Sequence, residues 1–479
     1  MSQKHILGID IGTSSVRAAL YDERAKMLPN TLVKNERQLT ATNDGGSEID
    51  AGEALLQVSA VIGDVLAHYS EELAEESYVA TASFWHSLIG VDVNGNPTTK
   101  VFGWADTRSR NYTKDLKRRF NETEIHNRTG AKFHSSFWPA KLLWLRKEFP
   151  DVFARTSQWL SLSDYLALKL FGTSVTSVSM ASGTGLLDLR TCKWDSELLK
   201  FLKIQPKNLP RLADDGETFV LNTKFARRWP RLKDARWFPA IADGAANNIG
   251  AGCVTKDRAA LMVGTSGAMR VAYEGKPPAK IPDGLWCYRI DRKRVIVGGA
   301  LSDGGGLYQW LRQTLRLDAR AEAELAKRAP GAHGLVFLPF LAGERSTGYN
   351  EDATGSIVGL RSSTDATDIL QAALESVAFR FAEIFDRLNS VCPIREIIAS
   401  GGALNESRVW TQIIADVLGR ELNLPVADEA SMRGAVLLAL GLPNVIETTA
   451  TTVTPSSVRN KAYRKARKRH QEVYRELQK

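Results

Sequence analysis

The chain of 479 residues has few cysteines and lacks the glycine motifs of two common nucleotide-binding folds. No segment reads Gly-x-x-x-x-Gly-Lys-Ser/Thr, and no Gly-x-Gly-x-x-Gly follows an expected strand. P-loop and dinucleotide-binding enzymes are therefore excluded. The four cysteines form no C-x-x-C pair, which argues against a zinc site or a disulfide framework and is typical of a reducing compartment. They are Cys192, Cys253, Cys287 and Cys392.

Long apolar runs are also missing. No apolar stretch approaches the roughly 18 residues that span a bilayer, and the first residues do not resemble a signal peptide. Hydrophobic residues make up 43% of the chain and charged residues 24%, as in soluble globular proteins. We therefore expect a cytoplasmic protein with no membrane partner. A prior of about 150 residues per domain favours two large domains or three small ones.

The net charge of +9 is concentrated at one end of the chain. Residues 459–479 contain nine Lys or Arg against two Glu, so this segment supplies +7 and the remainder +2. Apolar side chains recur there at helical spacing, at Tyr463, Ala466, His470, Val473 or Tyr474, and Leu477. The pattern predicts an amphipathic terminal helix with a solvated basic face. Nucleic acid is thus not the expected partner, although an anionic partner of this helix and a homodimer stay open.

One turn occurs twice, at residues 8–15 and 262–267. Each copy contains Gly-Thr-Ser, follows an apolar run, and continues into a second apolar run that carries Arg17 or Arg270. The pattern predicts a strand, a tight turn and a returning strand. Glycine lets the backbone approach a ligand, and the hydroxyls add donors beside the turn amides. One copy would most often be a plain hairpin. Two copies, with Asp10 beside the first, predict two related halves that hold one phosphate-rich ligand.

Strands and helices alternate in both halves of the chain. We expect helices at 51–70, within 139–171, and at 365–389, 407–418 and 432–440, and strands at 78–83, 87–93 and 396–400. This alternation predicts two α/β domains with a boundary near 245–255. The two turns are offset by 252 positions, about half the chain, which favours a duplication.

An acidic residue stands just before the second half. A small apolar run at 239–242 leads to Asp243, which opens a Gly- and Ala-rich segment at 244–250. Without bulky neighbours, this carboxylate is open to a ligand. It is equally suited to cap the helix that follows, so these residues alone support capping and catalysis alike.

Three longer segments carry a family resemblance. Residues 355–360, with Asp368, Ile369 and 372–375, match one signature, and residues 400–403, with Trp410, Gln412 and 415–416, resemble an adenosine-binding segment. Residues 141–148 are similar to another signature, with Trp138 where a small residue or Pro is usual. Together they resemble the FGGY carbohydrate kinases, within the actin, Hsp70 and hexokinase-like ATPase superfamily. The resemblance runs from Leu7 to Leu477.

The resemblance implies an α/β protein of two actin/hexokinase-like (ribonuclease H-like) domains, with the active site in the cleft between them. Residues 1–247 would form the sugar-binding side, and residues 248–479 the nucleotide-binding side with the basic terminal helix. The implied reaction is the ATP-dependent, Mg²⁺-assisted phosphorylation of a terminal hydroxyl of a sugar or sugar acid. A non-catalytic sensor of nucleotide or sugar is the alternative of another class, which the retention of the acidic residues disfavours.

The resemblance also assigns roles residue by residue. Asp10 would position Mg²⁺ through water, and Asp243 would be the general base on the substrate hydroxyl. Two phosphate loops are implied, one of Gly12, Thr13 and Ser14 and one of Gly264, Thr265, Ser266 and Gly267. The adenosine pocket is implied at Gly401, Gly402, Ala403 and Asn405. Gly299 and Asp303 would approach the phosphates, with Asp303 near the place where Asn is usual.

The sugar side most resembles the gluconate kinases of the family, through residues 86–89, 104–108, 129–134 and 343–346. Substrate contacts are implied at His86, Trp104, Asp106, Arg108, His134 and Asp243. A sugar acid needs a cation for its carboxylate, which His86, Arg108 or His134 would supply. Each of these is equally explained as an ordinary surface or half-buried residue. Phe84 and Trp85 depart from the family pattern, so xylulose or another ketopentose or polyol is the runner-up substrate.

Overall fold

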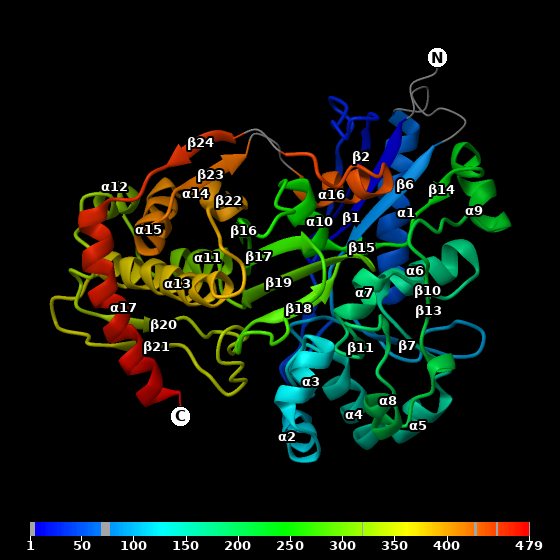
Figure 1. The fold of residues 1–479 in the computed structure, drawn as a ribbon, viewed down its shortest axis with the longest axis horizontal. Helices are drawn as coiled ribbons and strands as arrows, with labels where there is room; N and C mark the ends of the chain where they lie inside the picture. Colours follow the sequence, from blue (N-terminus) through cyan, green and yellow to red (C-terminus); the bar gives the residue numbers. More distant parts are fainter. Residues whose placement is uncertain (1–4, 69–76, 319, 426–428, 447–448, 479) are drawn as a thin grey trace.

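The computed structural model describes residues 5–68, 77–318, 320–425, 429–446 and 449–478. Two α/β lobes lie side by side, the first on the right of Figure 1 and the second on the left. The expected strands 78–83 and 396–400 are confirmed as β6 (Tyr78–Ser83) and β22 (Glu396–Ser400). The expected strand 87–93 is shorter, as β7 (Ile89–Val91).

The first lobe is built on a six-stranded sheet in the order β14-β6-β1-β2-β3, with β15 also paired to β6. The strands are β1 (Ile6–Ile11), β2 (Ser15–Tyr21), β3 (Val33–Glu36), β14 (Arg236–Trp237) and β15 (Ile241–Ala242). β1 is antiparallel to β2 and parallel to β6. Helix α1 (Ala51–His68) buries its apolar stripe in the core of this sheet. The last two residues of the expected helix, 69–70, lie outside the described residues.

The second lobe repeats this plan on a seven-stranded sheet, β18-β19-β17-β16-β22-β23-β24. The strands are β16 (Arg258–Val263), β17 (Gly267–Glu274), β18 (Trp286–Arg289), β19 (Arg294–Leu301), β23 (Leu422–Pro425) and β24 (Thr449–Val453). β16 is antiparallel to β17 and parallel to β22, as β1 is to β2 and β6. Both Gly-Thr-Ser turns therefore join the first two strands of a sheet, as the sequence predicts.

The rest of the first lobe is a series of short helices and strands after β3. They are β4 (Thr40–Ala41), β5 (Ser47–Ile49), β8 (Val101–Phe102), α2 (Arg110–Arg119), α3 (Glu122–Thr129), α4 (Trp138–Glu148), α5 (Pro150–Arg155), β9 (Gln158–Leu160), α6 (Leu162–Phe171), β10 (Val175–Thr176), α7 (Val178–Ser182), β11 (Leu187–Asp188), β12 (Lys193–Trp194), α8 (Ser196–Leu202), β13 (Arg211–Leu212) and α9 (Thr223–Arg228). The helical pattern at 139–171 thus divides into α4, α5 and α6. Pro150 starts α5, and a capping box at Ser161 starts α6.

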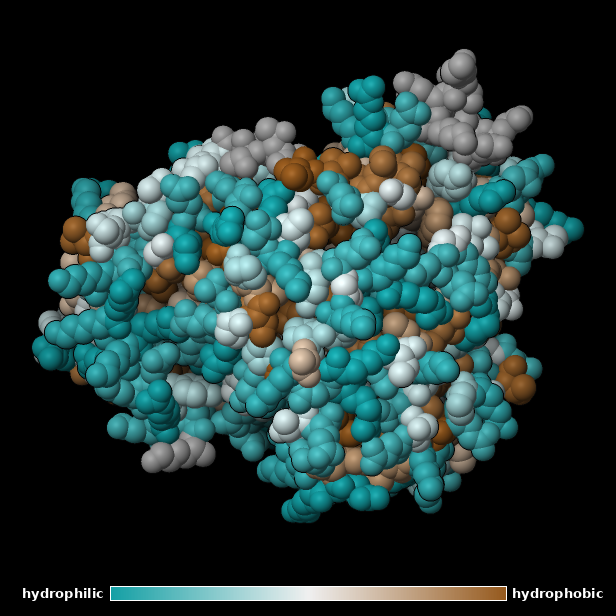
Figure 2. All heavy atoms as spheres, in the orientation of Figure 1, coloured by the Kyte–Doolittle hydropathy of each residue, from teal (hydrophilic) through white to brown (hydrophobic). Residues whose placement is uncertain are grey.

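Helix α13 (Ala366–Asn389) is the long central helix of the second lobe. Around it lie α11 (Gly305–Thr314), α12 (Ala321–Leu325), β20 (Val336–Leu338), β21 (Ser356–Val358), α14 (Gly402–Glu406), α15 (Arg408–Leu418) and α17 (Ser457–Leu477). α17 runs down the outer edge of the lobe (Figure 1) and buries Tyr463 and His470, while Leu477 is exposed. In Figure 2 that edge is largely hydrophilic, as the basic face predicts.

Two helices join the lobes. α10 (Asp243–Gly250) and α16 (Ala430–Ala439) pack closely, because a Cβ at Gly434 would overlap the carbonyl of Ala246. α16 also packs on β1 and β6, so a segment late in the sequence covers the first sheet. The expected division at 247/248 falls within α10 and stays a prediction. No helix among the described residues is both long and apolar enough to cross a bilayer.

Candidate active site

Asp10 and Asp243 lie at the same edge of the first sheet. β1 and β15 are both parallel to β6 and flank it, with Asp10 opposite Ala82 and Ala242 opposite Ser83. The two aspartates therefore lie at the same end of strands on either side of β6, two strand spacings or about 10 Å apart across the sheet and offset by two residues along it. The pairing brings together residues that are distant in the sequence.

Asp10 has the surroundings of a cation site. Its Oδ1 is buried, and no group in the described part of the chain hydrogen-bonds to it. Burial, Asp243 and Glu429 raise the pKa of Asp10 to about 7, while Arg17 and Arg37 lower it. A divalent cation would replace the proton that this carboxylate otherwise holds. No three His, Cys, Asp or Glu side chains cluster among the described residues, so water and phosphate oxygens would supply the remaining ligands.

The first turn is held from behind by Arg37. Its guanidinium donates a hydrogen bond to the Gly12 carbonyl, and its backbone N–H donates to Ser14 O at 2.8 Å. Gly12 N–H donates to Ser15 O at 2.9 Å and closes the turn. Arg37 is buried, and its Nε and Nη1 make no hydrogen bond to the described residues. No local motif marks this arginine, because its role depends on the pairing of β2 with β3.

Asp243 is the first residue of α10, and the cap position before it belongs to Ala242. Asp243 Oδ1 accepts a hydrogen bond of 2.6 Å from Gly244 N–H. Burial raises the pKa of Asp243, whereas the nearby Arg270 lowers it. Arg270 also anchors the helix, because its Nη1 donates to Gly244 O at 3.1 Å and to Asn247 Oδ1 at 3.3 Å. The side chain is therefore at the start of the helix, and its charge is close enough to raise the pKa of Asp10.

Arg17 follows the first turn as Arg270 follows the second, but it does not bond to α10. Arg17 forms an ion pair of 2.6 Å with Glu429, the residue that precedes α16. Glu429 is thereby brought close enough to Asp10 for its charge, like that of Asp243, to raise the pKa of Asp10. No local motif marks it, since its partner is 412 positions away in the sequence.

The second turn meets the starts of α11 and α14. Gly264 O accepts from Gly305 N–H at 2.7 Å, and Thr265 O accepts from Gly304 and Gly306 at 3.1 and 2.9 Å. A Cβ at Gly401, whose φ is +112°, would overlap Val263 O. The structure thus brings together most of the residues expected to hold nucleotide, namely Gly264, Thr265, Ser266, Gly267, Asp303, Gly401, Gly402 and Ala403. The run Gly304–Gly306 was missed, although three consecutive glycines are visible in the sequence.

Gly299 and Asn405 have different surroundings. Gly299 lies beneath Ile384 of α13, whereas Asn405 is exposed on α14, where its backbone N–H donates to Gly401 O at 3.3 Å. Asp303 stays near the second turn, where its Oδ2 accepts from Leu341 N–H at 3.1 Å. Burial raises the pKa of Asp303 to about 7, so this residue is partly neutral at physiological pH, as the usual Asn would be.

On the sugar side, His86 and Trp85 belong to an aromatic cluster beside α10. The Trp85 ring lies 5.0 Å from that of Tyr288, and its Nε1 donates to Ser179 O at 3.1 Å. His86 Nδ1 lies 2.5 Å from Gly183 O. Burial lowers the pKa of His86 well below its usual value and that of His134 to about 4. Both imidazoles are therefore neutral at pH 7.

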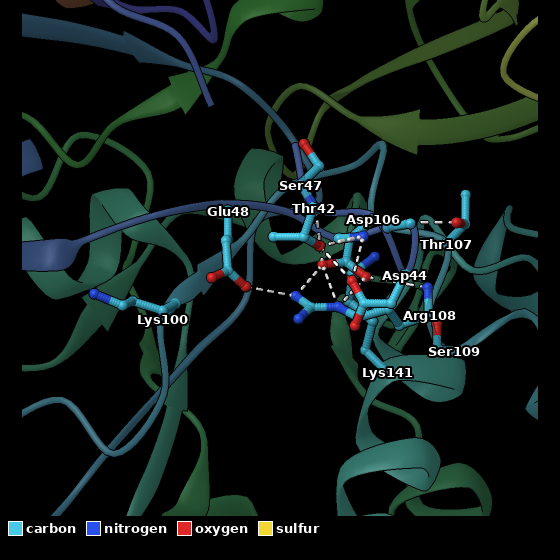
Figure 3. A network of polar contacts seen from close by, with 12 residues as sticks. Thr42, Asp44, Ser47, Glu48, Lys100, Asp106, Thr107, Arg108, Ser109 and Lys141 are labelled. Atoms are coloured by element: carbon cyan, nitrogen blue, oxygen red, sulfur yellow. Dashed lines mark hydrogen bonds and ion pairs between the residues drawn. The ribbon is translucent and has the colours of Figure 1, made fainter. Parts of the chain in front are cut away.

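Arg108 and Asp106 interact with each other. Arg108 Nη2 donates to Asp106 Oδ2 at 2.5 Å and to Glu48 Oε2 at 2.7 Å. Figure 3 shows these contacts together with the bond from Ser47 N–H to Asp106. Two carboxylates thus balance the charge of Arg108. Lys141, a buried lysine of the segment 141–148 that resembles a family signature, lies in the same region and donates to Ser135 O.

Two α/β lobes with the same strand plan, each with a Gly-Thr-Ser turn between its first two strands, form the actin and hexokinase-like fold. The N-terminal domain of the FGGY family of carbohydrate kinases matches residues 5–229, and its C-terminal domain matches residues 259–441. The chain belongs to the FGGY family and is a carbohydrate kinase.

Several relatives cover nearly the whole chain. A gluconokinase from Bacillus licheniformis is 30% identical over 91% of this chain and 87% of its own. Structures of a gluconate kinase and a xylulose kinase, both from Lactobacillus acidophilus, each have a TM-score of 0.89 at 29% and 28% identity. Each covers 99% of this chain and 98% of its own. A Plasmodium falciparum glycerol kinase solved with ADP shares the fold at a TM-score of 0.82 and 20% identity, over 99% of this chain and 98% of its own.

Proposed function

We propose that this kinase uses ATP and Mg²⁺ to phosphorylate the terminal hydroxyl of a sugar acid, D-gluconate, giving 6-phosphogluconate. The observation that carries the proposal is the placement of Asp10 and Asp243 on either side of β6, with Asp10 directly before the first Gly-Thr-Ser turn. A cytoplasmic location belongs to the proposal, because that compartment supplies ATP.

Asp243 acts as the general base. The open position of its Oδ2, which no described group hydrogen-bonds, allows it to accept the proton of the substrate hydroxyl. Such assistance contributes about 10²–10⁴-fold to a rate. Arg270 holds α10 in place while the proton moves.

The two turns hold the phosphates from opposite sides. Phosphoryl transfer has a loose transition state, so positioning and charge balance on the phosphoryl oxygens supply most of the catalysis. The hydroxyls of Thr13, Ser14, Thr265 and Ser266 would serve this purpose with backbone N–H groups of the turns, apart from that of Gly12, which closes its own turn. Asp10 would hold Mg²⁺, which offsets phosphate charge when bound. Closure of the lobes would exclude water, a competing acceptor.

The sugar acid is favoured by the relatives named gluconokinase and gluconate kinase. A xylulose kinase is almost equally similar, so phosphorylation of xylulose or another ketopentose or polyol is the second candidate. The separate class of a non-catalytic sensor is disfavoured, because Asp10, Asp243 and both turns are present together.

ADP release measured with D-gluconate, D-xylulose, D-ribulose, glycerol and erythritol tests the proposal. We expect the highest kcat/KM with D-gluconate. A higher kcat/KM with D-xylulose would identify xylulose as the preferred substrate and leave the proposed reaction, ATP-dependent phosphorylation, unchanged. ATP binding without ADP release on any acceptor would support the sensor and contradict the proposal.

A further inference from the structure

A sugar acid brings a carboxylate that needs a cation, and the three cations expected from the sequence do not meet this need. Arg108 is already paired with Asp106 and Glu48. His86 and His134 are buried, and burial keeps them neutral at pH 7. A neutral imidazole still donates a hydrogen bond, but it offers no charge to a carboxylate.

Two further buried cations, Arg270 beside Asp243 and Lys141 on the sugar side, already have partners within the protein. Arg270 donates its hydrogen bonds to α10 and is fully enclosed. Lys141 Nζ donates to the Ser135 carbonyl and is fully buried, with Asp106 and Glu351 among its electrostatic partners.

Arg345 differs from all of these. It lies on the connection between β20 and β21 in the second lobe, and its guanidinium lies 5.0 Å from the ring centre of Trp104 in the first lobe. Within the described part of the chain, its guanidinium forms no ion pair or hydrogen bond. It is nevertheless close enough to Asp243, Tyr288 and Tyr349 to interact with them electrostatically. Arginine stays charged at pH 7 and presents donors that match both oxygens of a carboxylate.

We propose that Arg345 binds the carboxylate of the substrate and makes the enzyme selective for sugar acids over neutral sugars; this rests on the proposed function. In D-gluconate the carboxylate and the reactive terminal hydroxyl are at opposite ends of the chain. Arg345 is near Asp243 but forms no ion pair or hydrogen bond with it. A substrate can therefore lie between them, with its carboxylate at Arg345 and its reactive hydroxyl at Asp243. Trp104 would support the same substrate from the first lobe, so carboxylate binding favours the closed arrangement.

The loop that carries Arg345 is firmly supported. The neighbouring Glu344 is buried against Arg380 of α13 and accepts a hydrogen bond of 2.6 Å from Tyr474 of α17. Thr347 Oγ1 donates to Glu383 at 3.0 Å. These contacts hold the backbone on both sides of Arg345. The position of its guanidinium therefore does not depend on an ion pair with a carboxylate of the protein.

The test compares Arg345→Gln with the wild type on D-gluconate and on D-glucitol, a neutral analogue with CH₂OH in place of the carboxylate. We expect kcat/KM for D-gluconate to fall about 10- to 100-fold, as for a hydrogen bond to a charged group, and that for D-glucitol to change less than about threefold. Arg345→Lys should recover part of the gluconate activity. Arg361→Gln, at an exposed arginine on the connection that follows β21, is the control and should leave kcat/KM for both substrates unchanged.

Equal losses on both substrates, or none on D-gluconate, would overturn the proposal. Calorimetry with D-gluconate in the absence of nucleotide distinguishes a failure of the Arg345 proposal from a failure of the proposed function. One outcome is that the wild type binds D-gluconate without phosphorylating it and that Arg345→Gln weakens this binding. This result would support Arg345 as the carboxylate-binding residue and contradict the proposed gluconate kinase activity. No gluconate binding by the wild type would overturn both.

Discussion

Tyr474 of the terminal helix donates a hydrogen bond of 2.6 Å to Glu344, the residue before Arg345. Glu344 is buried and also pairs with Arg380, so the carboxylate joins α17, α13 and the loop of the sugar side. Burial raises the pKa of the Tyr474 hydroxyl, which therefore stays protonated and a donor. The basic terminal helix thus has a structural task in addition to its charged face.

Tyr474→Phe should destabilise the protein, because it removes a donor from a buried carboxylate. The expected loss is about 1–3 kcal/mol in the free energy of unfolding, measured by chemical denaturation. Arg475→Gln, at the next and exposed position, is the control and should change stability by less than about 0.5 kcal/mol. Equal stabilities of Tyr474→Phe and the control would contradict the assigned contact.

The basic face of α17 is expected to have no nucleic-acid partner. Deleting 459–479 is a poor test, because Tyr463 and His470 of this segment are buried. Changing the exposed Lys461, Lys465 and Lys468 to Gln leaves the buried face intact. We expect no binding of duplex DNA at about 0.15 M salt in fluorescence anisotropy. Wild-type binding that survives this salt and is lost in the triple variant would show that the expectation is wrong.

Gly401 and Gly402 offer a matched pair for the nucleotide side. A Cβ at Gly401 would overlap Val263 O and would require a positive φ, whereas nothing lies within 4 Å of a Cβ at Gly402. Gly401→Ala should displace the start of α14 and raise the Kd for MgATP at least tenfold, while Gly402→Ala stays within about threefold. The cost of such strain is about 1–3 kcal/mol. Similar Kd values for both variants in calorimetry would argue against nucleotide binding at this turn.

The pH dependence of stability should report the burial of Lys141. Burial lowers its pKa from 10.5 to about 8, with Asp106 and Glu351 opposing the shift. Below pH 8 the ammonium is charged in both states, and the native state bears the full desolvation cost. Between pH 8 and 10.5 the unfolded chain binds more protons, so stability rises with pH.

Lys141→Met removes this titration. Relative to the variant, the wild type should gain about 3 kcal/mol between pH 7.5 and 10.5, measured as the difference in unfolding free energy at each pH. A difference that does not change with pH would show that Lys141 titrates normally in the native state.

The sequence predicts the regular elements where one local pattern decides them. The strands at 78–83 and 396–400 were located correctly, because each is a short apolar run ended by a polar or Gly-rich turn. The region 139–171 was less well predicted, since its helical periodicity continues through the breaks at Phe149 and at β9. The structure there depends on how these short elements pack.

The site was predictable where it has a motif and not where it depends on pairing or burial. Asp10, Asp243 and both turns stand in recognisable local sequence. Glu429 reaches the site only through the packing of α16, and Arg345 lies opposite Trp104 only through the contact of the two lobes. The neutrality of His86 and His134 follows from burial, which the sequence alone does not give.

The central claim is that Asp243 is the base of an ATP-dependent sugar kinase. Sugar-dependent ADP release by Asp243→Asn, measured beside the Kd for MgATP, tests it most directly. We expect turnover to fall about 10²–10⁴-fold while the Kd stays within about threefold, because Asn cannot accept the proton but keeps the shape of the side chain. An unchanged sugar-dependent rate would contradict the account.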